Sequence, residues 1–314
     1  MFSTIVISSA QTTSPSTTTK PLSITPHVSK GCFGAPSVNG IKIVPSPEPI
    51  TSIQATPDNG GYWLGDDGGT INCGDAPSTV LSGFNAGAGN CSGTVITTII
   101  TLDQKGKWEL CTDNGVAAAY TTPFGDLTAG GATWYGDESQ AHLAKPLVGM
   151  AITPDQKGYW LVGADGGVFT FGDAGFFGSA GNINLVSPIV GIAATSTGKG
   201  YWLVGADGGI FNYGDAGFFG SAGNINLTSP IVGIVATSTD KGYWLVAADG
   251  GIFNYGDAGF FGSAGNINLV SPIVGIAATS TGKGYWLVGA DGGVFTFGDA
   301  QYFGSWYDAS INLF

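Results

Sequence analysis

Aspartate residues recur in pairs along the second half of the chain, and paired carboxylates can hold a divalent cation or perform acid–base chemistry. Asp165 and Asp173 form the first such pair, in the strings Ala-Asp-Gly-Gly and Gly-Asp-Ala. Both strings are typical of turns, where an aspartate side chain bonds to its own backbone. Calcium requires several oxygen ligands from one loop, and Asp-Gly-Gly offers a single carboxylate. We therefore predict no metal and no cofactor, and we predict structural turns at Asp165, Asp207, Asp249 and Asp291.

One cluster of potentially catalytic residues departs from this repetition. Asp126, Asp137, Glu138 and His142 lie close together in the chain. No spacing among them matches a nucleophile motif or a known acid–base pair. The sequence therefore predicts no catalytic residue and a protein that is not an enzyme. An enzyme would need a cleft that holds Asp137, Glu138 and His142 together.

Aromatic residues recur with the same spacing and could stack against sugar rings. Phe176 and Phe177 are adjacent, so on one strand their side chains would point to opposite faces. Large aromatic side chains dominate protein cores, so we expect one of the two to be packed and the other to be exposed. Identical exposed sites would bind together through avidity. The candidate ligand-binding residues are Phe176, Phe218, Phe260, Trp134 and Tyr135.

All of these residues belong to a repeat, because Trp160 and Trp202 stand 42 residues apart within nearly identical surroundings. Within one unit, residues 157–162 and 168–171 are two apolar runs joined by an Asp-Gly turn, which predicts a hairpin. Residues 176–179 and 188–195 supply two further predicted strands, and no helical period is present. Six units centre on Trp63, Trp108, Trp160, Trp202, Trp244 and Trp286.

A four-stranded antiparallel unit of this length has the size of one propeller blade. Residues 159–162 are apolar on both faces, as expected for a sheet covered on each side by a neighbour. Residues 188–195 are small enough to converge on an axis. We predict an all-β chain in which residues 31–314 form a β-propeller of about six four-stranded blades. A flat β-solenoid is the alternative, although its coils are normally shorter.

The N-terminal region, residues 1–30, contains one short apolar strand followed by a Ser/Thr/Pro-rich stalk. Cys32 and Phe33 then resemble Phe176 and Phe177, which gives seven candidate third strands for six units. The extra copy indicates either a partial seventh blade or a surplus strand that pairs with another chain. Strands donated in this way build filaments when the geometry does not close. The candidate assembly strand comprises Ile5, Val6, Ile7, Cys32 and Phe33.

Composition excludes several partners. The 314 residues carry a formal net charge of −12 and all ten basic residues are lysines, so nucleic acid is a poor partner. No apolar run approaches 18 residues, so we expect no membrane insertion. The cysteines have no metal-site spacing and indicate one or two disulfides in an exterior protein, with three pairings open. These cysteines are Cys32, Cys73, Cys91 and Cys111.

The string YWLV-x-A-D-G-G-[VI]-F-x-[FY]-G-D-A-x-[FY]-[FY]-G-S, followed by P-I-V-G-[IM]-A-A-T, resembles tandem repeats of secreted and surface proteins from actinobacteria and their relatives. The resemblance covers roughly residues 49–306. It implies a propeller-like fold and an extracellular or cell-surface location, and it carries no catalytic residue because that family has no established activity of its own.

Three functions are open on this reading. The leading expectation is a non-enzymatic structural or adhesive protein that assembles with itself into fibres through its N-terminal strand. The second is a multivalent, lectin-like propeller that binds surface glycans. The third is the targeting module of a cell-wall hydrolase, because such repeats often flank hydrolase domains.

Overall fold

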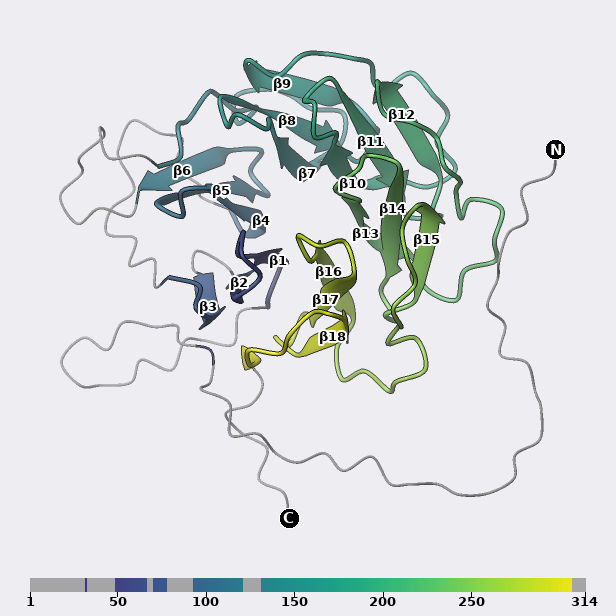
Figure 1. Cartoon of the computed structure of the whole chain (residues 1–314). Coiled ribbons are helices and arrows are strands. Elements are labelled where there is room, and N and C mark those ends of the chain that lie inside the picture. Colours follow the sequence, from purple (N-terminus) through teal and green to yellow (C-terminus); the bar gives the residue numbers. More distant parts are fainter. Residues whose placement is uncertain (1–31, 33–48, 67–69, 78–92, 121–130, 307–314) are drawn as a thin grey trace, which may run out of the picture.

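The computed structural model describes residues 32, 49–66, 70–77, 93–120 and 131–306, and this part of the chain is all-β. Its strands form six three-stranded antiparallel sheets in a repeated arrangement (Figure 1). Within every sheet the strand order follows the chain, so each sheet is a simple meander. No α-helix occurs among the described residues, and therefore none that could cross a bilayer.

The strands are short and evenly sized. Sheet one contains β1 (Ser52–Ala55), β2 (Gly61–Gly65) and β3 (Thr70–Gly74), and sheet two contains β4 (Val95–Ile100), β5 (Gly106–Cys111) and β6 (Val116–Tyr120). Sheet three contains β7 (Leu147–Ile152), β8 (Gly158–Gly163) and β9 (Val168–Gly172), and sheet four contains β10 (Ile189–Ala194), β11 (Gly200–Gly205) and β12 (Ile210–Gly214). Sheet five contains β13 (Ile231–Ala236), β14 (Gly242–Ala247) and β15 (Ile252–Gly256), and sheet six contains β16 (Ile273–Ala278), β17 (Gly284–Gly289) and β18 (Val294–Gly298).

The prediction of four strands per unit is wrong for the described residues, because residues 176–179 form no strand. Two features keep this segment out of a ladder. Gly178 adopts a φ of 138°, which a regular strand does not contain. The backbone groups of the segment also bond to side chains, since Gly175 O accepts from Trp160 Nε1 and Gly178 O accepts from Tyr201 Oη.

The middle strand of each sheet carries the core. All residues of β8, β11, β14 and β17 are buried. Alternation along the strand sends Trp160 toward the following sheet, where its ring lies 5.7 Å from that of Tyr201. Tyr201 and Leu203 correspondingly face sheet three and join one cluster with Trp160 and Val162. The apolar core is therefore divided into clusters that lie between neighbouring sheets.

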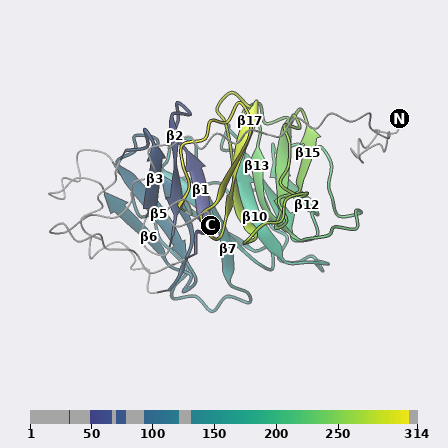
Figure 2. The ribbon, with the colours of Figure 1, turned by 90° about the horizontal axis from the view of Figure 1, so that it is seen from below.

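Neighbouring sheets also meet through their first strands. β7 contacts β10, β10 contacts β13, β13 contacts β16, β16 contacts β1, β1 contacts β4, and β4 contacts β7. Figure 1 shows these first strands near the centre of the view with the other strands outside them, and Figure 2 shows the strands of all sheets crossing the same layer. A hollow of about 160 Å³ is lined by residues at or beside the first strand of every sheet.

The contact between sheets six and one resembles the contacts between the other sheets. Ile189 N donates to Ala164 O at 3.0 Å between sheets three and four, and Ile50 N donates to Ala290 O at 3.0 Å between sheets one and six. The rings of Trp286 and Tyr62 lie 6.0 Å apart, in the same relation as Trp160 and Tyr201. First and last units of the array therefore contact one another through equivalent groups.

A disulfide fixes Cys32 to Cys73 on β3 of the same chain. Cys111 is also disulfide-bonded, and Cys91 lies outside the described residues. Phe303 and Trp306 pack against the same cluster of sheet one as Cys32. Both ends of the described chain therefore converge on the first sheet. Of the candidate assembly strand, Ile5, Val6, Ile7 and Phe33 lie outside the described residues.

Candidate functional site: exposed aromatic residues at the sheet junctions

A tyrosine near the start of each middle strand, except in sheet two, bonds to the unit before it. Tyr201 Oη donates to Gly178 O at 2.5 Å and accepts from Phe177 N at 3.2 Å. We call this pair of bonds the tyrosine latch. The equivalent latches join Tyr159 to Tyr135 and Gly136, Tyr243 to Phe219 and Gly220, Tyr285 to Phe261 and Gly262, and Tyr62 to Phe303 and Gly304.

The latch is insensitive to ordinary pH. Burial raises the pKa of Tyr201, and it raises the pKa of Tyr243 and Tyr285 in the same way. The backbone bond from Phe177 opposes this effect on Tyr201 but is the smaller cause. Burial also raises the pKa of Tyr255, a neighbour of Tyr243, to about 12. The latch hydroxyls therefore stay protonated and keep donating to the glycine carbonyl groups.

A second bond, which we call the tryptophan clamp, holds the backbone two residues before Phe177. Trp160 Nε1 donates to Gly175 O at 2.7 Å. The same bond joins Trp108 to Thr133, Trp202 to Gly217, Trp244 to Gly259 and Trp286 to Gln301. Phe176 therefore lies between two backbone groups that are held from both sides, Gly175 O and Phe177 N. Its backbone position is set by the fold before any ligand is present.

The residue held between the tryptophan clamp and the tyrosine latch is aromatic and exposed in every unit where it is described. We call these residues the junction aromatics. Their exposed fractions are 38% for Trp134, 61% for Phe176, 58% for Phe218, 52% for Phe260 and 40% for Tyr302. The following residue is packed: the ring of Phe177 lies 5.8 Å from that of Tyr201.

Four of the five predicted ligand-binding residues occupy the exposed position, and Tyr135 does not. Tyr135 takes the place of Phe177, with its ring 5.8 Å from Tyr159 and its hydroxyl donating to Gln156 O. Sequence reasoning did not name Tyr302, which aligns with Phe176 in the sixth unit. The signal was present, because Tyr302 and Phe303 precede Gly304 and Ser305 as Phe176 and Phe177 precede Gly178 and Ser179.

The recurring aspartates are engaged in local hydrogen bonds. Asp165 Oδ1 accepts from Gly167 N at 3.0 Å in the turn between β8 and β9. Asp207, Asp249 and Asp291 make the same bond to Gly209, Gly251 and Gly293. The second aspartate is bonded as well in units four to six: Asp215 accepts from the hydroxyl groups of Thr195 and Thr197, and Asp257 and Asp299 accept from the equivalent threonines. Among the described residues, no three His, Cys, Asp or Glu side chains are grouped as metal ligands.

The described part of the asymmetric cluster in the second unit comprises Asp137, Glu138 and His142. Asp137 Oδ1 accepts from Ser139 N and Ser139 Oγ, as in a local turn. Burial, and then the charge of Asp137, raises the pKa of Glu138. His142 is exposed, and Asp126 lies outside the described residues. These residues line neither the hollow of about 160 Å³ at the first strands nor the hollow of about 270 Å³ beside the Asp207 turn.

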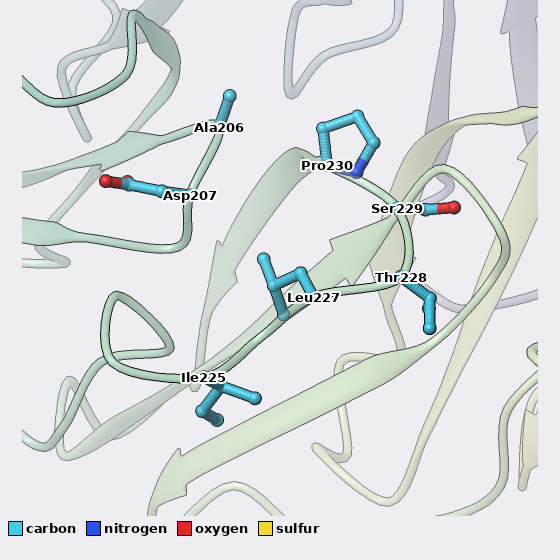
Figure 3. A pocket seen from close by; sticks show the side chains of 7 residues that line it. All are labelled: Ala206, Asp207, Ile225, Leu227, Thr228, Ser229 and Pro230. Carbon is cyan, nitrogen blue, oxygen red and sulfur yellow. The ribbon is translucent and has the colours of Figure 1, made fainter.

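A hollow of about 270 Å³ lies between the Asp207 turn and the loop that leads into sheet five (Figure 3). Ile225 and Leu227 give it an aliphatic lining, and the carboxylate of Asp207 points away from the loop that carries Leu227. Thr228 Oγ1 donates to Asp249 Oδ2 at 2.7 Å and is committed to the neighbouring unit. The hollow therefore offers few convergent polar groups for chemistry.

The chain matches no protein-family model and no curated protein. The resemblance to surface-protein repeats, and the location that it implies, accordingly stay predictions.

Proposed function

We propose that the six sheets close into a six-bladed β-propeller whose junction aromatics bind carbohydrate at several equivalent sites. Closure is supported by the contact between sheets six and one, which uses the same groups as the other junctions. Besides the Ile50–Ala290 bond and the Tyr62 latch, Asn59 Oδ1 accepts from Ser280 N at 2.8 Å. Asp240 accepts from Ser196 N at the corresponding place between sheets four and five. A ring requires its last unit to meet its first as any other pair of units meet.

The observation that carries the function is the persistence of an exposed aromatic residue at one position. The residue before it is Gly175 in unit three, Thr133 in unit two and Gln301 in unit six, so the surroundings change. The position itself is Trp, Phe or Tyr in units two to six, whereas in unit one Ser78 follows Pro77, whose carbonyl group accepts from Trp63. Burial does not explain this choice for a side chain such as Phe176, which is 61% exposed. A contact with something outside the chain explains it.

A neutral sugar ring is the ligand class that this surface fits best. A pyranose has an apolar face of C–H groups that covers an aromatic ring. The net charge of −12 and the absence of arginine disfavour anionic ligands. One aromatic ring per site gives weak binding, and repetition of the site gives useful avidity toward a polymer. This function is non-enzymatic and belongs outside the cell.

Affinity electrophoresis against soluble xylan, glucomannan and β-1,3-glucan, with pull-down on cellulose and chitin, tests the proposal. We expect at least one polymer to bind the chain and the triple variant Phe176→Ala, Phe218→Ala, Phe260→Ala to lose most of that affinity. Because avidity multiplies weak sites, the affinity of the triple variant for the polymer should fall on the order of 10²-fold, which is far more than three times the loss caused by Phe176→Ala alone.

The matched control is the double variant Val186→Ala, Val270→Ala, which removes exposed aliphatic side chains of the same repeat. It should bind as the unchanged chain does. Equal losses in the control and in the triple variant, or no binding to any polymer, would refute the proposal.

Assembly through strand donation stays a prediction, as does the role of a hydrolase targeting module. The Cys32–Cys73 disulfide holds Cys32 on its own chain. A strand donated to another copy would therefore have to come from residues before Cys32. Light scattering of the full chain beside a chain that lacks residues 1–31 tests this: polymers formed only by the full chain would support donation.

A further inference from the structure

The junction between sheets one and two differs from the others in the residues that it buries. Five junctions bury apolar clusters of seven to ten residues each. The described cluster at the junction of sheets one and two contains only Trp63, Ala76 and Ile100. Among the described residues of this junction, polar side chains occupy places that apolar side chains hold at the other junctions.

Lys107 and Glu109 are the most unusual of these polar residues. They occupy the positions of Tyr201 and Leu203, and they form an ion pair with side chains that are 2% and 1% exposed. Lys107 therefore stands where the other middle strands carry the latch tyrosine. Thr98 pairs with Glu109 across the strands, where Ile192 pairs with Leu203, and Thr98 Oγ1 is buried without a hydrogen-bond partner among the described residues.

Sheet one supplies matching polar groups. Ser52 Oγ accepts from Thr98 N at 3.2 Å. Gln54 bonds to Ile100 twice, with Oε1 accepting from its N at 2.7 Å and Nε2 donating to its O at 3.0 Å. Sheet four carries Gly191 and Ala193 at the places of Ser52 and Gln54, and these residues lack such groups.

We infer that this polar junction specifies which sheets become neighbours when the chain folds. Units three to six are nearly identical, so their interfaces are interchangeable, and repeat proteins of this kind misassemble by pairing wrong units or by exchanging units between copies. If sheet two packed against the tryptophan face of another sheet, Thr98 and Ile100 would lose their bonds to Ser52 and Gln54. Leaving buried polar groups unpaired is strongly unfavourable, so sheet two accepts sheet one alone.

The test replaces the polar junction with the residues that unit four carries at the same places. This junction variant contains Ser52→Gly, Gln54→Ala, Thr98→Ile, Lys107→Tyr and Glu109→Leu. Hydrophobic replacement of a whole buried ion pair is often neutral or stabilising, so we expect the urea midpoint of unfolding to be retained or raised. After refolding at increasing protein concentration, we expect light scattering to show a larger fraction of swapped dimers and larger species than the unchanged chain forms under the same conditions.

The control raises the identity between repeats elsewhere, with Thr228→Val in the loop before β13 and Val235→Ala on β13, and should refold to monomer. If the junction variant refolds to monomer as completely as the unchanged chain, the inference is wrong. If the junction variant does not fold, the smaller variant Ser52→Gly, Gln54→Ala decides the matter, because it removes only the groups by which sheet two distinguishes sheet one. Multimers from this smaller variant support the inference, and monomers alone overturn it.

Discussion

Removal of one hydroxyl group tests whether sheets six and one are joined in solution. In Tyr62→Phe, the backbone groups Phe303 N and Gly304 O lose their shared partner, and both lie about 240 residues from Tyr62 in the chain. A buried polar group left unpaired costs about 1–3 kcal/mol. The Tyr62 hydroxyl serves two groups near a partly buried surface, so we expect a loss of about 2–4 kcal/mol in the free energy of unfolding.

The chain offers both a positive and a negative control. Tyr201→Phe removes the equivalent latch between sheets three and four, and it should cost the same amount. Tyr213→Phe should cost little, because units three and six already carry Phe171 and Phe297 at that place. Urea unfolding followed by the fluorescence of the buried tryptophans measures all three.

A specific pattern of results would refute the ring. If Tyr62→Phe costs no more than Tyr213→Phe while Tyr201→Phe shows the full loss, sheets six and one do not form a latched junction in solution. An equal loss in Tyr62→Phe and Tyr201→Phe is the result that a closed ring requires.

Three further predictions follow from the geometry. The double variant Cys32→Ala, Cys73→Ala opens a loop of 41 residues and should lower the free energy of unfolding by about 4 kcal/mol, measured by urea unfolding of non-reduced protein. Burial raises the pKa of Tyr201, so the latch contributes its full stability below the ordinary tyrosine pKa of about 10, and this stability is lost as pH rises through the pKa of the folded state. The melting temperature should therefore fall above about pH 10, and it should fall less steeply for Tyr201→Phe. Gly172→Ala should cost about 1–3 kcal/mol, because Gly172 has a φ of 66° and an added Cβ would meet Lys157 O at 2.1 Å; Gly191→Ala, which meets Val204 Cγ1 at 3.4 Å, is the mild comparison.

Local pattern predicts the fold well where the partners of a segment are close in the chain. The Asp-Gly turn joins strands only a few residues apart, so β8 and β9 follow directly from their apolar runs and from the turn chemistry. The 42-residue spacing predicts a repeated all-β arrangement, because each unit must cover the apolar faces of its neighbours.

The segment of Phe176 shows where local pattern is insufficient. Its aromatic residues and glycines resemble a strand, but its backbone groups bond to Trp160 and Tyr201, and Tyr201 belongs to the next unit. Those bonds depend on how sheets pack, which a strand propensity does not contain. The same packing decides that Tyr135 is covered while Trp134 is exposed.

The local sequence pattern also fails to indicate the buried ion pair of sheet two. Lys107 and Glu109 are charged residues two positions apart, a pattern that normally indicates one solvated face of a strand. Only the alignment of the second unit with the other repeats places them at core positions. The repeat itself, used as an internal alignment, was therefore the available signal.

The most direct test of the account is the number of sugar sites on one chain. A short oligosaccharide cut from the polymer that binds best would be titrated into the protein by calorimetry, with Phe176→Ala, the triple phenylalanine variant and the valine control measured beside it. The account predicts weak, equivalent sites, at least five for the five described junction aromatics, with one site lost for each aromatic removed. A single site, or a number of sites that the aromatic substitutions leave unchanged, would contradict it.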